Sequence, residues 1–130
     1  MAFYVDTSAF VKLVVEETDS AALRTWIEGN NSELFSSDLL RTEGLRAARR
    51  HSVEALVETR QRLDAITIVA ISTDVCERAA ELDPLILRAL DALHLAAALT
   101  AAGDLEGIVT YDDRLAAAAS LHGVAVVTPR

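Results

Sequence analysis

Short apolar runs of strand-forming residues alternate along the chain with longer segments whose apolar positions recur at helical spacing. The strand-like runs cover residues 3–5, 33–36, 66–71, 107–110 and 124–127. They are apolar over most of their length, as strands buried on both faces of a sheet are. Because a helical segment separates each run from the next, the pattern predicts an α/β fold with a parallel sheet that helices cover on both faces.

Most of the helical segments begin at a residue that favours helix N-termini. The expected starts are residues 7–8, 18–20, 37–38, 52, 72–74, 91 and 112. The segment that Asp91 opens is the most apolar, and it is expected to be helical from 92 to 102. Parallel sheets bind ligands beyond the carboxyl ends of their strands, where the strand order reverses. The residues that follow the strands are therefore the candidates for a functional site.

Size and composition indicate a single domain over residues 1–130, which we expect to be cytoplasmic. Apolar residues make up 52% of the chain and charged residues 25%, which excludes a disordered or collagen-like protein. The lone cysteine, Cys76, excludes a disulfide framework and a zinc ribbon, and its thiol is expected to be buried and inert. No apolar stretch approaches the ~20 residues of a membrane-spanning helix, so no membrane contact is expected.

The formal net charge of −8 argues against a polyanionic partner, but the basic residues are unevenly distributed. Six arginines fall between residues 41 and 62, where only three glutamates oppose them, so this segment carries +3. A solvated helix face explains each arginine taken alone. As a set they also fit a stripe that faces phosphate groups, so both interpretations stay open.

Four acidic residues stand at strand ends or in apolar surroundings. Asp6 and Asp112 follow strand-like runs, whereas Asp91 and Glu43 lie near the starts of helices. Each has an ordinary explanation, as a helix cap, as a favourable charge at a helix N-terminus, or as the partner of a nearby arginine. Gathered at one sheet edge, however, they repel one another unless a cation lies among them. Oxygen ligands select hard ions such as Mg²⁺ or Mn²⁺.

Four segments match a known family in order and spacing. They are YVDTSAFVKL at 4–13, SS at 36–37 with LRTE at 40–43, DALHLA at 91–96, and TYDDRL at 110–115. On these segments the chain resembles the PIN-domain ribonucleases, and most closely the VapC toxins of bacterial toxin–antitoxin pairs. The resemblance spans essentially the whole chain. It implies a PIN-like three-layer α/β/α sandwich around a central, mainly parallel sheet of four to five short strands.

The resemblance also implies an activity, which is metal-assisted hydrolysis of RNA phosphodiester bonds. The catalytic acids that would hold Mg²⁺ or Mn²⁺ are Asp6, Glu43, Asp91 and Asp112. The supporting positions in the same motifs are Thr7, Ser8, Thr110 and Asp113. The candidate RNA-binding residues, just beyond the glutamate on its helix, are Arg46, Arg49 and Arg50. The implied partners are RNA, a second copy of the chain in a homodimer, and a cognate VapB-like antitoxin whose tail covers the acidic site.

Two other functions are weighed against this one. A PIN-like domain that has lost catalysis and serves only protein interaction would keep the same fold. A phosphoacceptor receiver domain is also a small α/β sheet, but it needs an acidic pair after the first strand and a lysine after a later one. Here only Asp6 follows the first strand, and the only lysine is Lys12. The receiver-like function is therefore disfavoured.

Some further residues are predicted to support the structure. His94 lies three residues after Asp91 on the apolar helix, and it is expected to be a hydrogen-bonded core or supporting group and not a base. The apolar residues of the first two helical segments serve either as a contact surface for a partner or as ordinary core; they are Phe10, Val14, Val15 and Trp26.

Overall fold

Five short strands form one fully parallel sheet in the computed structural model, which describes residues 1–130. The strands are β1 (Ala2–Val5), β2 (Glu33–Ser37), β3 (Thr67–Val69), β4 (Leu105–Val109) and β5 (Val126–Val127). Their spatial order is β3-β2-β1-β4-β5, so the chain builds outward from β1 first on one side and then on the other. The strand order therefore reverses between β1 and β4.

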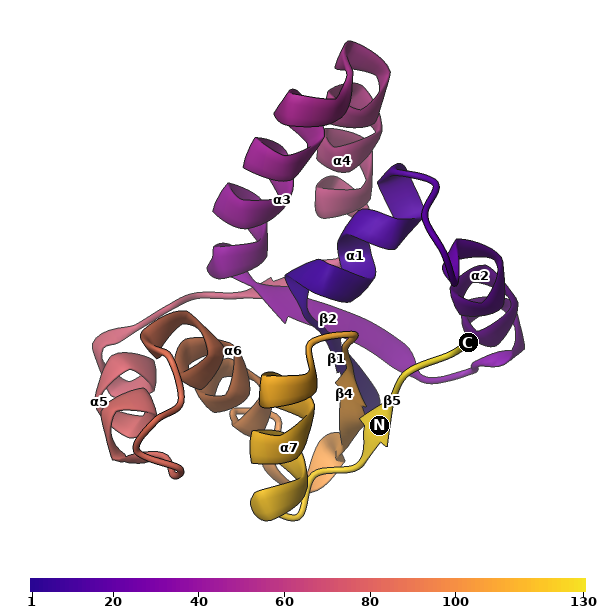
Figure 1. Cartoon of the computed structure of the whole chain (residues 1–130). Coiled ribbons are helices and arrows are strands. Elements are labelled where there is room, and N and C mark those ends of the chain that lie inside the picture. The colour runs from indigo at the N-terminus through magenta and orange to yellow at the C-terminus, as the bar shows by residue number, and fades with distance from the viewer.

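Seven α-helices cover the sheet in two layers (Figure 1). One layer holds α1 (Thr7–Val14), α2 (Ser20–Gly29), α3 (Asp38–His51) and α4 (Val53–Ala65). The other holds α5 (Thr73–Glu81), α6 (Ala89–Leu99) and α7 (Asp113–Leu121). A 3₁₀ turn, η1 (Ala102–Asp104), follows α6. This arrangement confirms the predicted three-layer α/β/α sandwich with a central parallel sheet.

The hydrophobic core is divided between the two faces of the sheet. Successive strand residues point to opposite faces, so Tyr4 and Ile108 pack under α5, α6 and α7, whereas Val5 and Val109 pack under α1 to α4. Phe10 and Val14 belong to the second of these clusters, which confirms their interpretation as ordinary core. Each fully buried side chain of this kind contributes roughly 1.5–3 kcal/mol.

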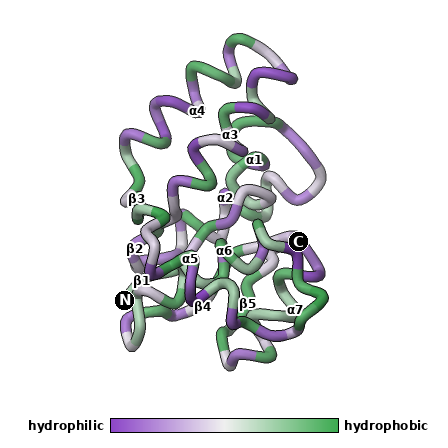
Figure 2. Tube along the Cα trace, turned by 90° about the vertical axis from the view of Figure 1, so that its left-hand side faces the viewer, coloured by the Kyte–Doolittle hydropathy of each residue, from purple (hydrophilic) through white to green (hydrophobic).

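Helices α3 and α4 form a hairpin that rises from the sheet (Figure 1). Hydrophilic and hydrophobic positions alternate along the trace of α4 in Figure 2, which is typical of a helix with one buried side. Its buried residues are Ala55, Thr59 and Leu63, at helical spacing. The hairpin carries the arginine-rich segment of residues 41–62. No helix is both long enough and apolar enough to cross a membrane.

Several predicted boundaries were wrong for identifiable reasons. The third strand covers only Thr67–Val69 because its single neighbour, β2, ends at Ser37 opposite Val69. Helix α6 begins at Ala89, because the carbonyl of Arg88 already accepts the first helical hydrogen bond from Ala92 at 2.9 Å. Asp91 consequently lies within the first turn of α6 and does not open it.

The predicted burial of Cys76 is also wrong, since this residue is exposed. Helix α5 buries Val75 and Ala79, which lie four residues apart on one face. Cys76 follows Val75 by about 100° around the helix and so turns toward solvent.

Candidate active site

The candidate site lies where the strand order reverses, at the carboxyl ends of β1 and β4. Asp6 directly follows β1, and its backbone N–H donates to the carbonyl of Val109 at 3.2 Å. Thr110 directly follows β4. Ser36 and Ser37 close β2 on the other side of β1. This is the edge at which open parallel sheets bind ligands, so the predicted site residues gather where the topology favours a site.

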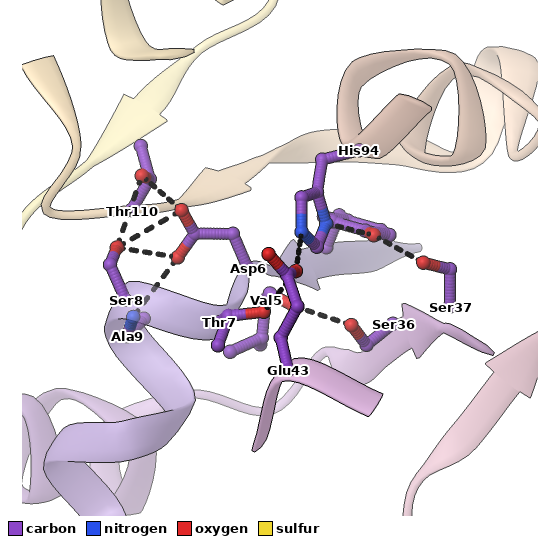
Figure 3. Close-up of polar contacts among 11 residues, drawn as sticks. Val5, Asp6, Thr7, Ser8, Ala9, Ser36, Ser37, Glu43, His94 and Thr110 are labelled. Atoms are coloured by element: carbon purple, nitrogen blue, oxygen red, sulfur yellow. Dashed lines mark hydrogen bonds and ion pairs between the residues drawn. The ribbon is translucent and has the colours of Figure 1, made fainter. Parts of the chain in front are cut away.

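Asp6 is the most buried acid of this edge, with 3% of its surface exposed. It caps α1 by accepting the backbone N–H of Ala9 at 3.0 Å. The Ser8 hydroxyl donates to Oδ1 at 2.7 Å and the Thr110 hydroxyl donates to Oδ2 at 2.5 Å (Figure 3). Burial raises the pKa of Asp6, and these donors oppose that rise. The predicted supporting positions Ser8 and Thr110 therefore contact the carboxylate.

Glu43 reaches the same edge from the second turn of α3. Its Oε1 accepts the Thr7 hydroxyl at 2.8 Å and lies 2.7 Å from Nε2 of His94 (Figure 3). The hydrogen bond from His94 is the largest cause that lowers the pKa of Glu43. The partners of Glu43 are thus Thr7 on α1 and His94 on α6. Glu43 does not form the ion pair with a nearby arginine that the sequence also allowed.

His94 continues this contact into the core. Its Nδ1 lies 2.7 Å from the Tyr4 hydroxyl, which in turn lies 2.8 Å from the Ser37 hydroxyl. Burial raises the pKa of the Tyr4 phenol, so this group stays protonated. His94 is only 4% exposed, which confirms that it is a hydrogen-bonded core group. Its partners, Tyr4 and Glu43, lie 90 and 51 residues away along the chain, so no local sequence pattern indicates them.

Asp91 and Asp112 complete the acidic edge. Asp91 lies in the first turn of α6. Burial is the largest cause that raises its pKa, and the negative charge of Asp112 is the second largest. Asp112 caps α7 by accepting the backbone N–H groups of Arg114 and Leu115 with Oδ1, at 2.9 and 3.1 Å. Asp113 is exposed at the start of α7. Asp91 and Asp112 are thus close enough to repel each other.

The four predicted acids share one edge, but Asp6, Glu43 and Asp112 each have separate hydrogen-bond partners and Asp91 has none. No group of three or more His, Cys, Asp and Glu side chains is arranged to hold a metal ion as the side chains lie here. The donor set nevertheless fits a hard divalent cation, because it consists of carboxylates and hydroxyls. The negative charges of Asp112 and Glu43 also repel that of Asp91, and a cation among these carboxylates would relieve the repulsion. A shared metal centre stays a prediction.

A cleft of about 570 Å³ leads from this edge along α1 and α3. Thr7, Ser8 and Glu43 form its acidic end. Arg46 and Arg50 lie further along it and are exposed, as is Arg49 beside them. None of these three arginines takes part in an ion pair. In a chain with an excess of acids, three unpaired arginines next to an acidic edge indicate a place for an external anion.

Comparison with known proteins identifies the family. The model of the PIN domain family matches residues 3–121. The chain belongs to the PIN-domain family. Ribonuclease VapC46 of Mycobacterium tuberculosis is 39% identical over 128 residues, which cover 98% of each chain. Ribonuclease VapC47 of the same species is 35% identical over 130 residues, covering 97% of this chain and 96% of the relative. The predicted place of this PIN-domain protein among the VapC-type ribonucleases is confirmed.

Solved structures agree with the fold of this PIN-domain protein. A toxin–antitoxin complex from Klebsiella pneumoniae contains a chain with a TM-score of 0.73 and 23% identity, with 98% of each chain covered. VapC20 of Mycobacterium tuberculosis, a toxin that cleaves the sarcin–ricin loop, gives a TM-score of 0.76 at 19% identity, with 98% of this chain and 99% of VapC20 covered. The fold is therefore shared at low sequence identity.

Proposed function

We propose that this VapC-type ribonuclease is a divalent-metal-dependent endoribonuclease and the cytoplasmic toxin of a VapBC-type toxin–antitoxin pair. The observation that carries the proposal is the gathering of acids from four separate segments at the edge where the strand order reverses. The residues proposed to hold Mg²⁺ or Mn²⁺ and to carry out catalysis are Asp6, Glu43, Asp91 and Asp112. A divalent ion bound there supplies positive charge for the phosphate and makes a water molecule a better nucleophile.

The chain's own residues prepare the acidic edge for this chemistry. Ser8 and Thr110 hold the carboxylate of Asp6, and Thr7 holds that of Glu43. Asp112 keeps Oδ2 free of any hydrogen bond, and Asp91 makes none at all, so both have oxygen atoms available for a cation or its water. Asp113 is exposed at the start of α7, so it is proposed to lie at the rim of the site and not to hold the metal.

RNA is proposed to bind along the cleft between α1 and α3. Arg46, Arg49 and Arg50 would contact phosphates on one side of the scissile bond, while the acids with their cation contact the scissile phosphate. This division explains how a chain with a net charge of −8 binds a polyanion. The negative charge at the catalytic edge is compensated by the cation, and the unpaired arginines attract the backbone.

A homodimer is proposed through an apolar surface next to α6. Leu85 and Ile86 are 94% and 89% exposed in the segment before this helix. A groove of about 550 Å³ lies beside them, between the same segment and α7. Protruding apolar side chains next to an apolar groove allow two identical copies to fill each other's grooves about a twofold axis.

An antitoxin is proposed to silence the enzyme at the acidic edge. The chemistry that fits is an arginine inserted among the carboxylates, because guanidinium pairs with carboxylate through two parallel hydrogen bonds. Such a side chain would replace the positive charge of the cation. A VapB-like protein that supplies this arginine would compete with both the metal and RNA.

Incubation of the purified protein with RNA tests the catalytic proposal. The expected result is cleavage with Mn²⁺ or Mg²⁺, loss of cleavage with EDTA, and recovery when the metal is added back. Asp6→Asn is expected to abolish cleavage while the protein stays folded. Cleavage that survives both EDTA and Asp6→Asn comes from a contaminant and is not activity of this protein. A folded protein that cleaves no RNA under any of these conditions favours the interaction domain without catalysis.

A further inference from the structure

The two oxygens of Glu43 have different surroundings. Oε1 accepts the Thr7 hydroxyl and lies 2.7 Å from Nε2 of His94, whereas Oε2 makes no hydrogen bond. Two donors occupy the two lone-pair directions of Oε1. Oε2 is therefore the oxygen that is left for an external group.

When the imidazole of His94 is neutral, its contacts set the direction of each hydrogen bond. A carboxylate only accepts, so Nε2 must carry the proton that faces Glu43. In the neutral imidazole this leaves Nδ1 as an acceptor, and the Tyr4 phenol donates to it. The Ser37 hydroxyl then donates to the Tyr4 oxygen. We call this series of contacts the Ser37–Tyr4–His94–Glu43 relay.

The relay joins parts of the fold that otherwise touch the site separately. Ser37 ends β2 and Tyr4 lies in β1, while His94 comes from α6 and Glu43 from α3. Helices α6 and α3 belong to opposite layers of the sandwich (Figure 1), and their side chains meet beyond the ends of the strands (Figure 3). Glu43 stands at the base of the projecting hairpin, so its contact with His94 links this hairpin to α6 in the opposite layer.

We propose that His94, oriented by Tyr4, is a positioning residue that holds Oε1 of Glu43 and thereby presents Oε2 to the divalent cation or to a water bound to it. This inference rests on the proposed metal-dependent function. His94 does not touch the metal or RNA itself. The hydrogen-bond partners of metal-binding groups typically change metal affinity by about 10- to 100-fold when they are removed, and the same range is expected here.

Mn²⁺ affinity of the free protein, measured by electron paramagnetic resonance, tests the relay without relying on activity. His94→Leu is expected to weaken Mn²⁺ binding by about 10- to 100-fold. His94→Gln keeps an N–H donor near the position of Nε2 and is expected to recover a large part of the loss. His122→Gln, at the far end of α7, is the matched control and is expected to bind Mn²⁺ as the wild type does.

Tyr4→Phe removes one oxygen and keeps the ring, so it tests the relay if His94→Leu fails to fold. This variant is expected to weaken Mn²⁺ binding less than His94→Leu does, and to lower kcat more than it raises KM for RNA. If folded His94→Leu binds Mn²⁺ as tightly as the wild type, the relay is overturned but the proposed function is not. If His94→Leu does not fold, wild-type Mn²⁺ affinity in folded Tyr4→Phe has the same meaning. A wild-type protein that neither binds Mn²⁺ nor cleaves RNA overturns the proposed function and the relay with it.

Discussion

Removal of two unpaired arginines should change the salt dependence of RNA binding by a calculable amount. Arg46 and Arg50 line the cleft that begins at Glu43, and neither forms an ion pair, so Arg46→Ala with Arg50→Ala breaks no ion pair within the protein. Arg49 is left in place. If each arginine meets one phosphate, the parent protein makes three such contacts and the double variant makes one.

The expected slopes follow from counterion release. For a single strand, each contact contributes about −0.7 to the slope of log K against log salt, so the slope is about −2.1 for the parent and about −0.7 for the variant. Raising the salt from about 50 to about 200 mM should then weaken binding about 18-fold in the parent but only about 2.6-fold in the variant. The difference is large enough to measure without exact knowledge of either affinity.

Fluorescence anisotropy with a labelled single-stranded RNA measures this slope. All proteins carry Asp6→Asn, so that the RNA stays intact. The matched control is Arg60→Ala with Arg78→Ala, which removes the same charge from exposed positions on α4 and α5 that also form no ion pair. The control should keep the parent slope. A double variant of Arg46 and Arg50 whose slope equals that of the parent would refute RNA binding in the cleft. If the slope of the control falls as much as that of the double variant, the change comes from the net charge of the protein and not from the cleft.

Three further predictions follow from burial and exposure. Burial raises the pKa of Asp6, so the folded protein is more stable when this carboxyl is protonated, and that stability is lost as the pH rises through the raised pKa. Asn stays uncharged at every pH. In EDTA, Asp6→Asn should therefore increase the free energy of unfolding at pH 7 by roughly 1–3 kcal/mol. Urea denaturation checks this, and a gain that does not shrink on acidification to about pH 4 contradicts it. Leu95→Ala, at a fully buried position, should cost about 2–5 kcal/mol, while Val57→Ala at a position that is 52% exposed should cost little. Ile86→Asp should convert a dimer into a monomer in analytical ultracentrifugation, and an unchanged mass would exclude this surface as the interface.

The local pattern of the sequence was sufficient for the fold. Continuous apolar runs predicted strands buried on both faces, and α1 begins at Thr7, within the expected start at residues 7–8. The pattern failed where a boundary depends on a neighbour. The end of β3 is set by the end of β2, and the start of α6 is set by the backbone of Arg88. An edge strand such as β3 forms ladder hydrogen bonds only where its single neighbour lies alongside it, so its own propensity does not decide where it ends.

The site was predictable as a set of residues but not as a network. The position of Asp6, Asp91 and Asp112 after strands or near helix starts pointed to one edge, and the topology brings them there. The contact between Glu43 and His94 joins residues 51 positions apart, and that between Tyr4 and His94 joins residues 90 apart. Periodicity describes neighbours within an element, so contacts between elements of opposite layers have no local signal.

The separate partners of the acids and a shared cation are compatible. A carboxylate has two oxygens, and a donor from the protein on one of them fixes the group without occupying the other. Glu43 is held through Oε1 and Asp112 through Oδ1, while the second oxygen of each makes no hydrogen bond. The protein thus orients like charges at one edge. Burial and then repulsion by Asp112 raise the pKa of Asp91, and a cation bound there would relieve that repulsion. Removing a donor should therefore loosen the metal site even though no metal ligand is lost.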